Sequence, residues 1–101
     1  IEEYKKAIDL DPLDPYVHYN LGKAYYNKEN IEEAVKEYNI AIKLKKDYIY
    51  PYHGLGLIYL KIGKFKEAIG YFKKVLEIEP GSDLAMEAEK GIKFAEFYGS
   101  F

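Results

Sequence analysis

The sequence predicts an all-α protein built from a repeated pair of helices, and two observations support this prediction. First, the chain aligns with itself at one constant shift, where residues of similar size and polarity coincide at many separate positions. This shift of 34 residues, which we call the repeat step, brings Leu21-Gly22 onto Leu55-Gly56 and Tyr38 onto Phe72. Second, the apolar residues within each repeated unit recur at steps of three and four residues, which is the spacing of one helix face.

The residues between these apolar patterns set the boundaries of six predicted helices. Asp14 before Pro15 indicates an N-terminal cap followed by a first-turn proline. Asn30, three residues before Glu33, indicates a capping box. Short polar turns, one of which contains Gly63, separate the two helices of each pair. We expect helices at roughly residues 1–10, 15–28, 31–45, 49–61, 65–78 and 83–98.

Composition limits the classes of function. The 101 residues are 49% hydrophobic, which is enough for one domain. The net charge is only -2, and charges of both signs share the same helices, so we expect neither nucleic acid nor a membrane as partner. No apolar run is long enough to span a bilayer and no signal-peptide pattern is present, so we expect a cytoplasmic protein. Because the chain begins with Ile1, we expect the natural protein to extend further upstream.

The recurring residues resemble a known family. The first full copy contains Leu21-Gly22-x-x-Tyr25, Ala34, Tyr38 and Ala41, and the second contains Leu55-Gly56-x-x-Tyr59, Ala68, Phe72, Val75 and Pro80. This pattern resembles the tetratricopeptide repeat (TPR). The resemblance implies a right-handed superhelical solenoid of antiparallel helix hairpins. His18 and Tyr52 depart from the pattern, because they stand where the family usually has Trp.

The resemblance also implies a division of the chain. We expect a single TPR-like domain over residues 1–101, with the second helix of an incomplete repeat at 1–14, whole repeats at 15–48 and 49–82, and a C-terminal capping helix at 83–101. In that last helix Glu89, Lys90 and Lys93 stand where the family would have Leu, Gly and Tyr. This departure is typical of a solvent-facing helix that closes such an array.

In the family, side chains on the first helix of each pair line a concave groove that binds an extended or helical peptide. Carried over position by position, that groove contains Tyr16, Tyr19, Asn20, Lys23, Tyr26, Asn27, Tyr50, His53, Leu57 and Lys61, and Leu84, Glu87, Ala88 and Gly91 continue it on the closing helix. Aromatic side chains with polar tips are enriched at protein interfaces. The alternative is that several of these tyrosines complete the packing of a chain that contains 12 of them.

Some family members hold the C-terminal carboxylate of chaperones through Lys and Asn side chains at set positions. If the first full repeat were the first of that set, Tyr19 should be Lys and Lys23 should be Asn. If it were the second, Asn20 fits, but Tyr50 and Gly54 should be basic. Both registers fail, so we do not expect binding of a chaperone tail.

The sequence contains few residues in patterns suited to catalysis or metal binding. It contains no cysteine, which excludes disulfides, zinc–thiolate sites and thiol nucleophiles. His18 and His53 lie at non-equivalent places with no further His near them, so we expect no metal site. No nucleophile and base form a recognisable pair, so we expect no enzyme and no cofactor. The predicted function is that of an adaptor or scaffold, a protein–protein interaction module that binds a peptide or a partner segment.

The two ends of the chain support a rival prediction. Apolar residues lie near both ends, namely Tyr4, Ala7 and Ile8 in the first helix and Phe94, Phe97, Tyr98 and Phe101 at the other end. They are suited to homo-oligomer formation through the N-terminal half repeat or the C-terminal helix. The simpler interpretation of the C-terminal aromatics is that they fold back over the last hairpin.

Overall fold

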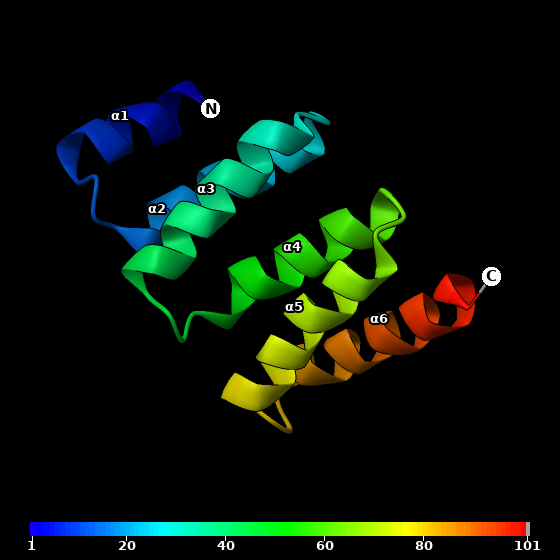
Figure 1. The fold of residues 1–101 in the computed structure, drawn as a ribbon. Helices are drawn as coiled ribbons and strands as arrows, with labels where there is room; N and C mark the ends of the chain where they lie inside the picture. The colour runs from blue at the N-terminus through cyan, green and yellow to red at the C-terminus, as the bar shows by residue number, and fades with distance from the viewer. Residues whose placement is uncertain (101) are drawn as a thin grey trace. The chain divides into compact units, whose positions relative to one another are not determined.

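The computed structural model describes residues 1–100 and contains six α-helices and no strand within that range (Figure 1). The helices are α1 (Glu2–Leu10), α2 (Pro15–Asn27), α3 (Ile31–Leu44), α4 (Ile49–Lys61), α5 (Phe65–Ile78) and α6 (Asp83–Gly99). Every predicted helix is present, and each of its ends lies within one residue of the predicted position. The all-α class is therefore confirmed. Phe101, one of the predicted C-terminal aromatics, lies outside the described residues.

The chain forms two compact units, residues 1–51 and the residues from Tyr52 onward. In the first unit α2 packs against both α1 and α3. In the second unit α5 packs against α6 and against the part of α4 that follows Pro51. The first three residues of α4 thus belong to the first unit and the rest of the helix to the second.

The core of the first unit is the seam between α2 and α3. Leu21 and Gly22 on α2 are buried, as are Ala34, Tyr38 and Ala41 on α3. A Cβ atom added at Gly22 would lie 2.7 Å from the Tyr38 ring, which is closer than two carbon atoms can approach. Glycine at this position lets the tyrosine ring pack directly against the backbone of α2.

The core of the second unit repeats this arrangement around one phenylalanine. Phe72 on α5 is fully buried, together with Ala68 and Val75 on the same helix. Added Cβ atoms at Gly56 on α4 and at Gly91 on α6 would lie 2.5 and 2.6 Å from its ring. Phe72 is therefore held between two glycines. The repeated glycines thus permit close packing of the paired helix.

The turns that join α2 to α3 and α4 to α5 share one backbone conformation. Glu29 and Gly63 are one repeat step apart, and both have left-handed φ angles, of 62° and 83°. The N–H of the next residue, Asn30 or Lys64, donates to a carbonyl in the last turn of the preceding helix, at 2.9 Å in the first turn and 2.8 Å in the second. These bonds form the Schellman motif, which satisfies the carbonyl groups left over at a helix end.

The predicted capping box at Asn30 is wrong. Its side chain makes no cap hydrogen bond, and its ψ angle of 78° matches the 77° of Lys64, which has no side-chain acceptor at all. Asp14 and Ser82, which do cap a helix through their side chains, have larger ψ angles, of 107° and 162°. They accept first-turn N–H groups of α2 and α6 at 2.9 and 3.0 Å. The Schellman turn fixes the entry to α3, so no side-chain cap forms.

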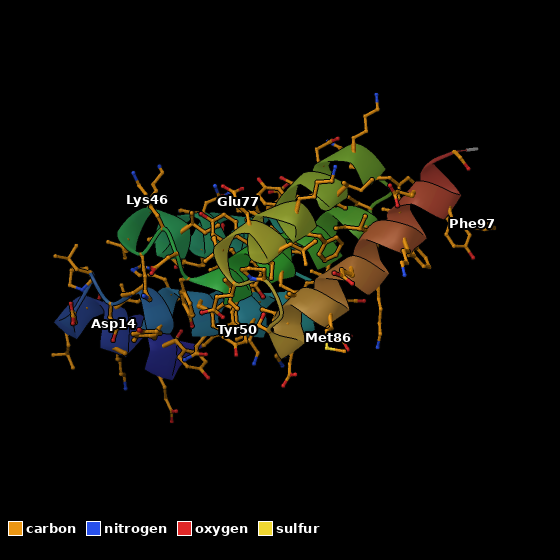
Figure 2. The ribbon with its side chains drawn as sticks, turned by 90° about the horizontal axis from the view of Figure 1, so that it is seen from below. Asp14, Lys46, Tyr50, Glu77, Met86 and Phe97 are labelled. Carbon is orange, nitrogen blue, oxygen red and sulfur yellow. The ribbon has the colours of Figure 1, made fainter. Side chains whose placement is uncertain are left out.

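Apolar side chains remain exposed on α6. Met86, Phe94, Phe97 and Tyr98 are 47–61% exposed, and Figure 2 shows Met86 and Phe97 projecting from the helix. The expectation that the C-terminal aromatics fold back over the hairpin is therefore wrong for those that the structure describes. Helix α6 buries smaller residues instead: Ala85, Ala88, Ile92 and Ala95.

Candidate peptide-binding surface

Four tyrosine rings gather in the first unit, where α2 begins and the chain enters α4. We call Tyr16, Tyr19, Tyr48 and Tyr50 the tyrosine cluster; Tyr50 is labelled in Figure 2. Tyr48 lies at its centre, with its ring centroid 5.1 Å from Tyr16, 5.4 Å from Tyr19 and 6.0 Å from Tyr50. All three pairs meet edge to face, which is a favourable geometry for aromatic rings.

The local fold explains how these rings come together. Tyr16 and Tyr19 lie three residues apart, so they share one face of α2. The Asp14 carboxylate accepts the N–H of Tyr16 at 2.9 Å and fixes the first turn of the helix. The Tyr38 ring on α3 stacks on Tyr19 at 5.7 Å and supports it from the core. The other two members of the cluster flank the first residue of α4.

The tyrosine cluster is open to solvent at its two outer members. Tyr16 is 52% exposed and Tyr50 is 49% exposed, whereas Tyr19 and Tyr48 are half-buried. Burial raises the pKa of Tyr48 to about 12, and the neighbouring phenols and the Asp14 carboxylate add to this rise. Burial also raises the pKa of Tyr19. These hydroxyl groups therefore stay protonated at physiological pH and can donate hydrogen bonds.

A positive charge borders the cluster. The Nζ atom of Lys23 lies 5.7 Å from the centre of the Tyr19 ring, within the range of a cation–π interaction. Asn20 and Asn27 are exposed on the same helix, and Tyr26 is half-buried close to Tyr38. The structure thus brings together the predicted residues Tyr16, Tyr19, Lys23 and Tyr50.

Tyr48 is the member of the cluster that the sequence analysis missed. It lies one repeat step after Asp14 and one before Ser82, so it precedes α4 as those two residues precede α2 and α6. Asp and Ser are good N-terminal caps, whereas a tyrosine side chain is not suited to capping. That mismatch in the repeat was the signal that could have singled Tyr48 out.

His53 and its predicted neighbours lie in the second unit. The His53 ring is half-buried with its centroid 5.6 Å from that of Phe72. Burial lowers the pKa of His53, and the Glu87 carboxylate partly opposes this change. His53 therefore favours the neutral form and packs between the helices. Leu57 and Lys61 are exposed on α4.

The predicted continuation of the groove along α6 is only partly open. Leu84 is half-buried and Glu87 is exposed. Ala88 is fully buried, and Gly91 lies against the Phe72 ring. Both residues pack against α5 because their small size allows close contact between the helices; Ala88 is therefore not available to a ligand, whereas Gly91 is half-buried.

His18 and Glu37 form a buried hydrogen-bonded pair. Its Nδ1 atom lies 2.8 Å from Oε1 of Glu37, and its Nε2 atom lies 2.8 Å from the carbonyl oxygen of Pro12. A carbonyl oxygen can only accept, so Nε2 carries a hydrogen and donates it. His18 is 5% exposed and Glu37 is 8% exposed. The pair ties the loop before α2 to α3, and this internal bonding assigns it a structural role.

The second unit contains an open pocket of about 250 Å³. Its lining residues are Tyr52, Glu67, Gly70, Tyr71 and Lys74. A Cβ atom added at Gly70 would meet nothing within 4 Å, so this part of α5 is uncovered. Among residues 1–100 no group of three or more His, Cys, Asp or Glu side chains is arranged to hold a metal ion.

Comparison with known proteins agrees with this fold. The TPR repeat family matches residues 1–29 and 24–63, and the tetratricopeptide repeat matches residues 49–82. The chain belongs to the tetratricopeptide-repeat family. The resemblance inferred from the repeated Leu-Gly and aromatic positions is confirmed. None of the helices described for this TPR protein is long and apolar enough to cross a membrane.

Several curated relatives are larger TPR proteins. The chain is 35% identical over 81 residues to the Protein CTR9 homolog of Arabidopsis thaliana, covering 76% of this chain and 7% of that protein. It is 34% identical over 80 residues to RNA polymerase II-associated protein 3 of Mus musculus, covering 79% of this chain and 12% of that protein. This TPR chain therefore spans only a small part of the relatives that it matches.

Solved TPR structures superimpose on most of the chain. The first TPR of Spaghetti (RPAP3), bound to the HSP90 peptide SRMEEVD, matches with a TM-score of 0.87 and 26% identity, over 97% of this chain and 75% of that one. The second TPR domain of human RPAP3, in complex with the HSP70 peptide SGPTIEEVD, matches with a TM-score of 0.79 and 32% identity, over 91% and 77% of the two chains. Both relatives hold a short peptide.

Proposed function

We propose that this TPR domain is an interaction module that binds an extended segment of another protein across the tyrosine cluster. The observation that supports this function is the exposure of Tyr16 and Tyr50 beside two half-buried phenols. Removing the surface of such rings from water is favourable, so a partner that covers Tyr16 and Tyr50 gains binding free energy. Tyrosine is also among the residues that dominate the energy of protein interfaces.

The related structures support peptide binding as the class of activity. The two RPAP3 domains hold chaperone peptides that end in EEVD. In our chain the positions expected to hold such a carboxylate carry Tyr19 and Lys23 in one register, and Tyr50 and Gly54 in the other. A phenol ring at the position of a lysine removes the charge that the carboxylate needs. We therefore propose a peptide ligand other than a chaperone tail.

Selection from a random peptide library tests this function. Peptides enriched on the wild-type domain are titrated against Tyr16→Ala and Tyr50→Ala by calorimetry. Tyr98→Ala is the matched control, because Tyr98 is also 49% exposed but lies on α6. We expect affinity to fall in the two cluster variants and to persist in the control, with circular dichroism unchanged. Equal affinity in all variants contradicts the proposal.

A second candidate function is self-association through α6. It is favoured by the exposure of Met86, Phe94 and Phe97, which a second copy of the chain can cover. The Tyr98 ring packs against Phe94 at 4.4 Å and against Phe97 at 5.0 Å, so the three rings form one patch. Sedimentation equilibrium tests it, with Phe94→Glu and Phe97→Glu as disrupting variants. A monomeric mass at high concentration excludes this candidate.

A further inference from the structure

We propose that the tyrosine cluster recognises a proline-containing segment of its partner in the polyproline II conformation. The inference rests on the proposed peptide-binding function and names the class of peptide. It is carried by the edge-to-face arrangement of Tyr16, Tyr19, Tyr48 and Tyr50 and by the hydrogen-bond donors that surround them.

The shape of the cluster suits a polyproline II helix. Such a helix has three residues per turn and advances about 9 Å in that turn, with ridges and furrows between its rings. Neighbouring rings in the cluster lie 5.1–6.0 Å apart and meet at interplanar angles of 52–71°. Rings set at such angles form ridges of their own. Because neighbouring rings touch at these distances, one turn of the ligand extends along two of them, and its prolines lie on the exposed surfaces of Tyr16 and Tyr50.

The hydrogen-bonding groups of the cluster suit the same ligand. A polyproline II segment makes no internal hydrogen bonds and its prolines have no N–H, so it presents carbonyl acceptors and few donors. The cluster presents phenol hydroxyls, which can both donate and accept hydrogen bonds, and burial raises the pKa of Tyr19 and Tyr48 above its ordinary value. Lys23 adds an ammonium donor over the Tyr19 ring. One oxygen of the Asp14 carboxylate accepts the N–H of Tyr16.

The position of Tyr48 is an independent argument for a binding role. The residues at the equivalent place before α2 and α6, Asp14 and Ser82, accept first-turn N–H groups through their side chains. A tyrosine side chain is not suited to that capping role, yet its ring lies at the centre of the cluster. The residue type therefore departs from its two repeat equivalents, which favours a role other than capping.

Other peptide classes fit the cluster less well. An acidic tail would lie close to the Asp14 carboxylate, which is near enough to affect the Tyr48 phenol. An amphipathic helix has its own N–H and C=O groups paired, so it cannot use the hydroxyl donors except through its side chains. A segment with free carbonyl groups and flat aliphatic rings uses both the donors and the aromatic faces.

The test is a titration of the intact chain with two capped peptides of about four polyproline turns each. One is polyproline, and in the other alanine replaces every proline. Each is titrated by calorimetry against the wild type, Tyr48→Ser, Tyr50→Ala and the control Tyr98→Ala. We expect the polyproline peptide to bind the wild type and the control alike, and to bind both cluster variants about tenfold more weakly or worse. The alanine peptide should not bind.

Each other outcome overturns the inference, and the proposed function is judged separately. If polyproline does not bind while library-selected peptides without proline bind and depend on Tyr50, the ligand class is wrong and the peptide-binding function stands. If polyproline binds equally to the wild type and both cluster variants, the cluster is not its site. If neither polyproline nor any library peptide depends on the cluster, both the inference and the proposed function fail.

Discussion

The same two repeat positions carry different chemistry in the two units. In the first unit His18 and Glu37 form a buried hydrogen-bonded pair. Their equivalents one repeat step later, Tyr52 and Tyr71, are uncharged aromatic residues beside an open pocket. The ring of Tyr71 stacks on Tyr59 at 5.4 Å. The repeat therefore fixes which positions meet and how much volume they fill, but it leaves the chemical nature of the contact free.

The tyrosine cluster shows the same freedom on the surface. The positions of Tyr19, Tyr48 and Tyr50 are taken in the next repeat by His53, Ser82 and Leu84. His53 packs against Phe72 and Ser82 caps α6, so both equivalents serve the fold. The candidate binding surface is consequently a property of the first unit and is not repeated in the second.

The largest expected effect concerns a feature that both units share, the aromatic ring packed on glycine. Phe72→Ala removes a fully buried ring that lies between Gly56 and Gly91. We expect the free energy of unfolding to fall by about 3–5 kcal/mol, measured by urea denaturation. Tyr38→Ala, at the equivalent position of the first unit, should give a loss of similar size. A loss below about 1 kcal/mol in either variant would show that the ring does not hold its unit together.

The buried pair of His18 and Glu37 should make substitutions cost more stability in the first unit than at the equivalent positions of the second. Glu37→Ala leaves the buried His18 without its partner, and we expect a loss of about 3 kcal/mol. Tyr71→Ala, at the equivalent half-buried position, should cost about 1 kcal/mol. A double-mutant cycle with His18→Ala isolates the coupling between His18 and Glu37. Equal losses at Glu37 and Tyr71 would contradict the distinction between the units.

Two glycines in the second unit should respond in opposite directions to the same change. Gly56→Ala places a Cβ atom 2.5 Å from the Phe72 ring, so we expect a loss of about 1–3 kcal/mol from overpacking. Gly70→Ala adds a methyl group to open space on α5 and should stabilise the protein by about 1 kcal/mol. Thermal unfolding of both variants checks the signs. Changes of the same sign would contradict the distinction between the packed Gly56 and the uncovered Gly70.

The sequence predicts the fold well because packing repeats. The repeat step aligns Gly22 with Gly56 and Tyr38 with Phe72, so two copies of one contact appear as two copies of one pattern. It predicts the candidate site only in part. The clustering of Tyr48 with the rings of α2 depends on how the chain turns from α3 into α4, and no spacing rule reports that turn. The failed capping box at Asn30 has the same cause, because the path of the backbone decides whether an acceptor reaches the N–H groups.

A smaller effect is expected at the left-handed residue of each turn. Glu29 adopts a φ angle of 62°, which is unfavourable for a residue with a Cβ atom, whereas the second unit has Gly63 there. Glu29→Gly should therefore stabilise the first turn by about 0.5–1 kcal/mol, and Gly63→Ala should destabilise the second by a similar amount. Chemical denaturation of the two variants measures both changes. Destabilisation by Glu29→Gly would mean that interactions of the Glu29 side chain stabilise the turn by more than the left-handed backbone conformation destabilises it.

The most direct test of the account is the affinity of Tyr48→Ser for the tightest peptide recovered from the library. This change removes the central ring of the tyrosine cluster and places a small polar side chain before α4, where the N–H of Tyr50 is equivalent to the Tyr16 N–H that Asp14 accepts. We predict affinity about tenfold weaker or worse in a protein that circular dichroism shows to be folded. Unchanged affinity would contradict the claim that the tyrosine cluster is the binding surface.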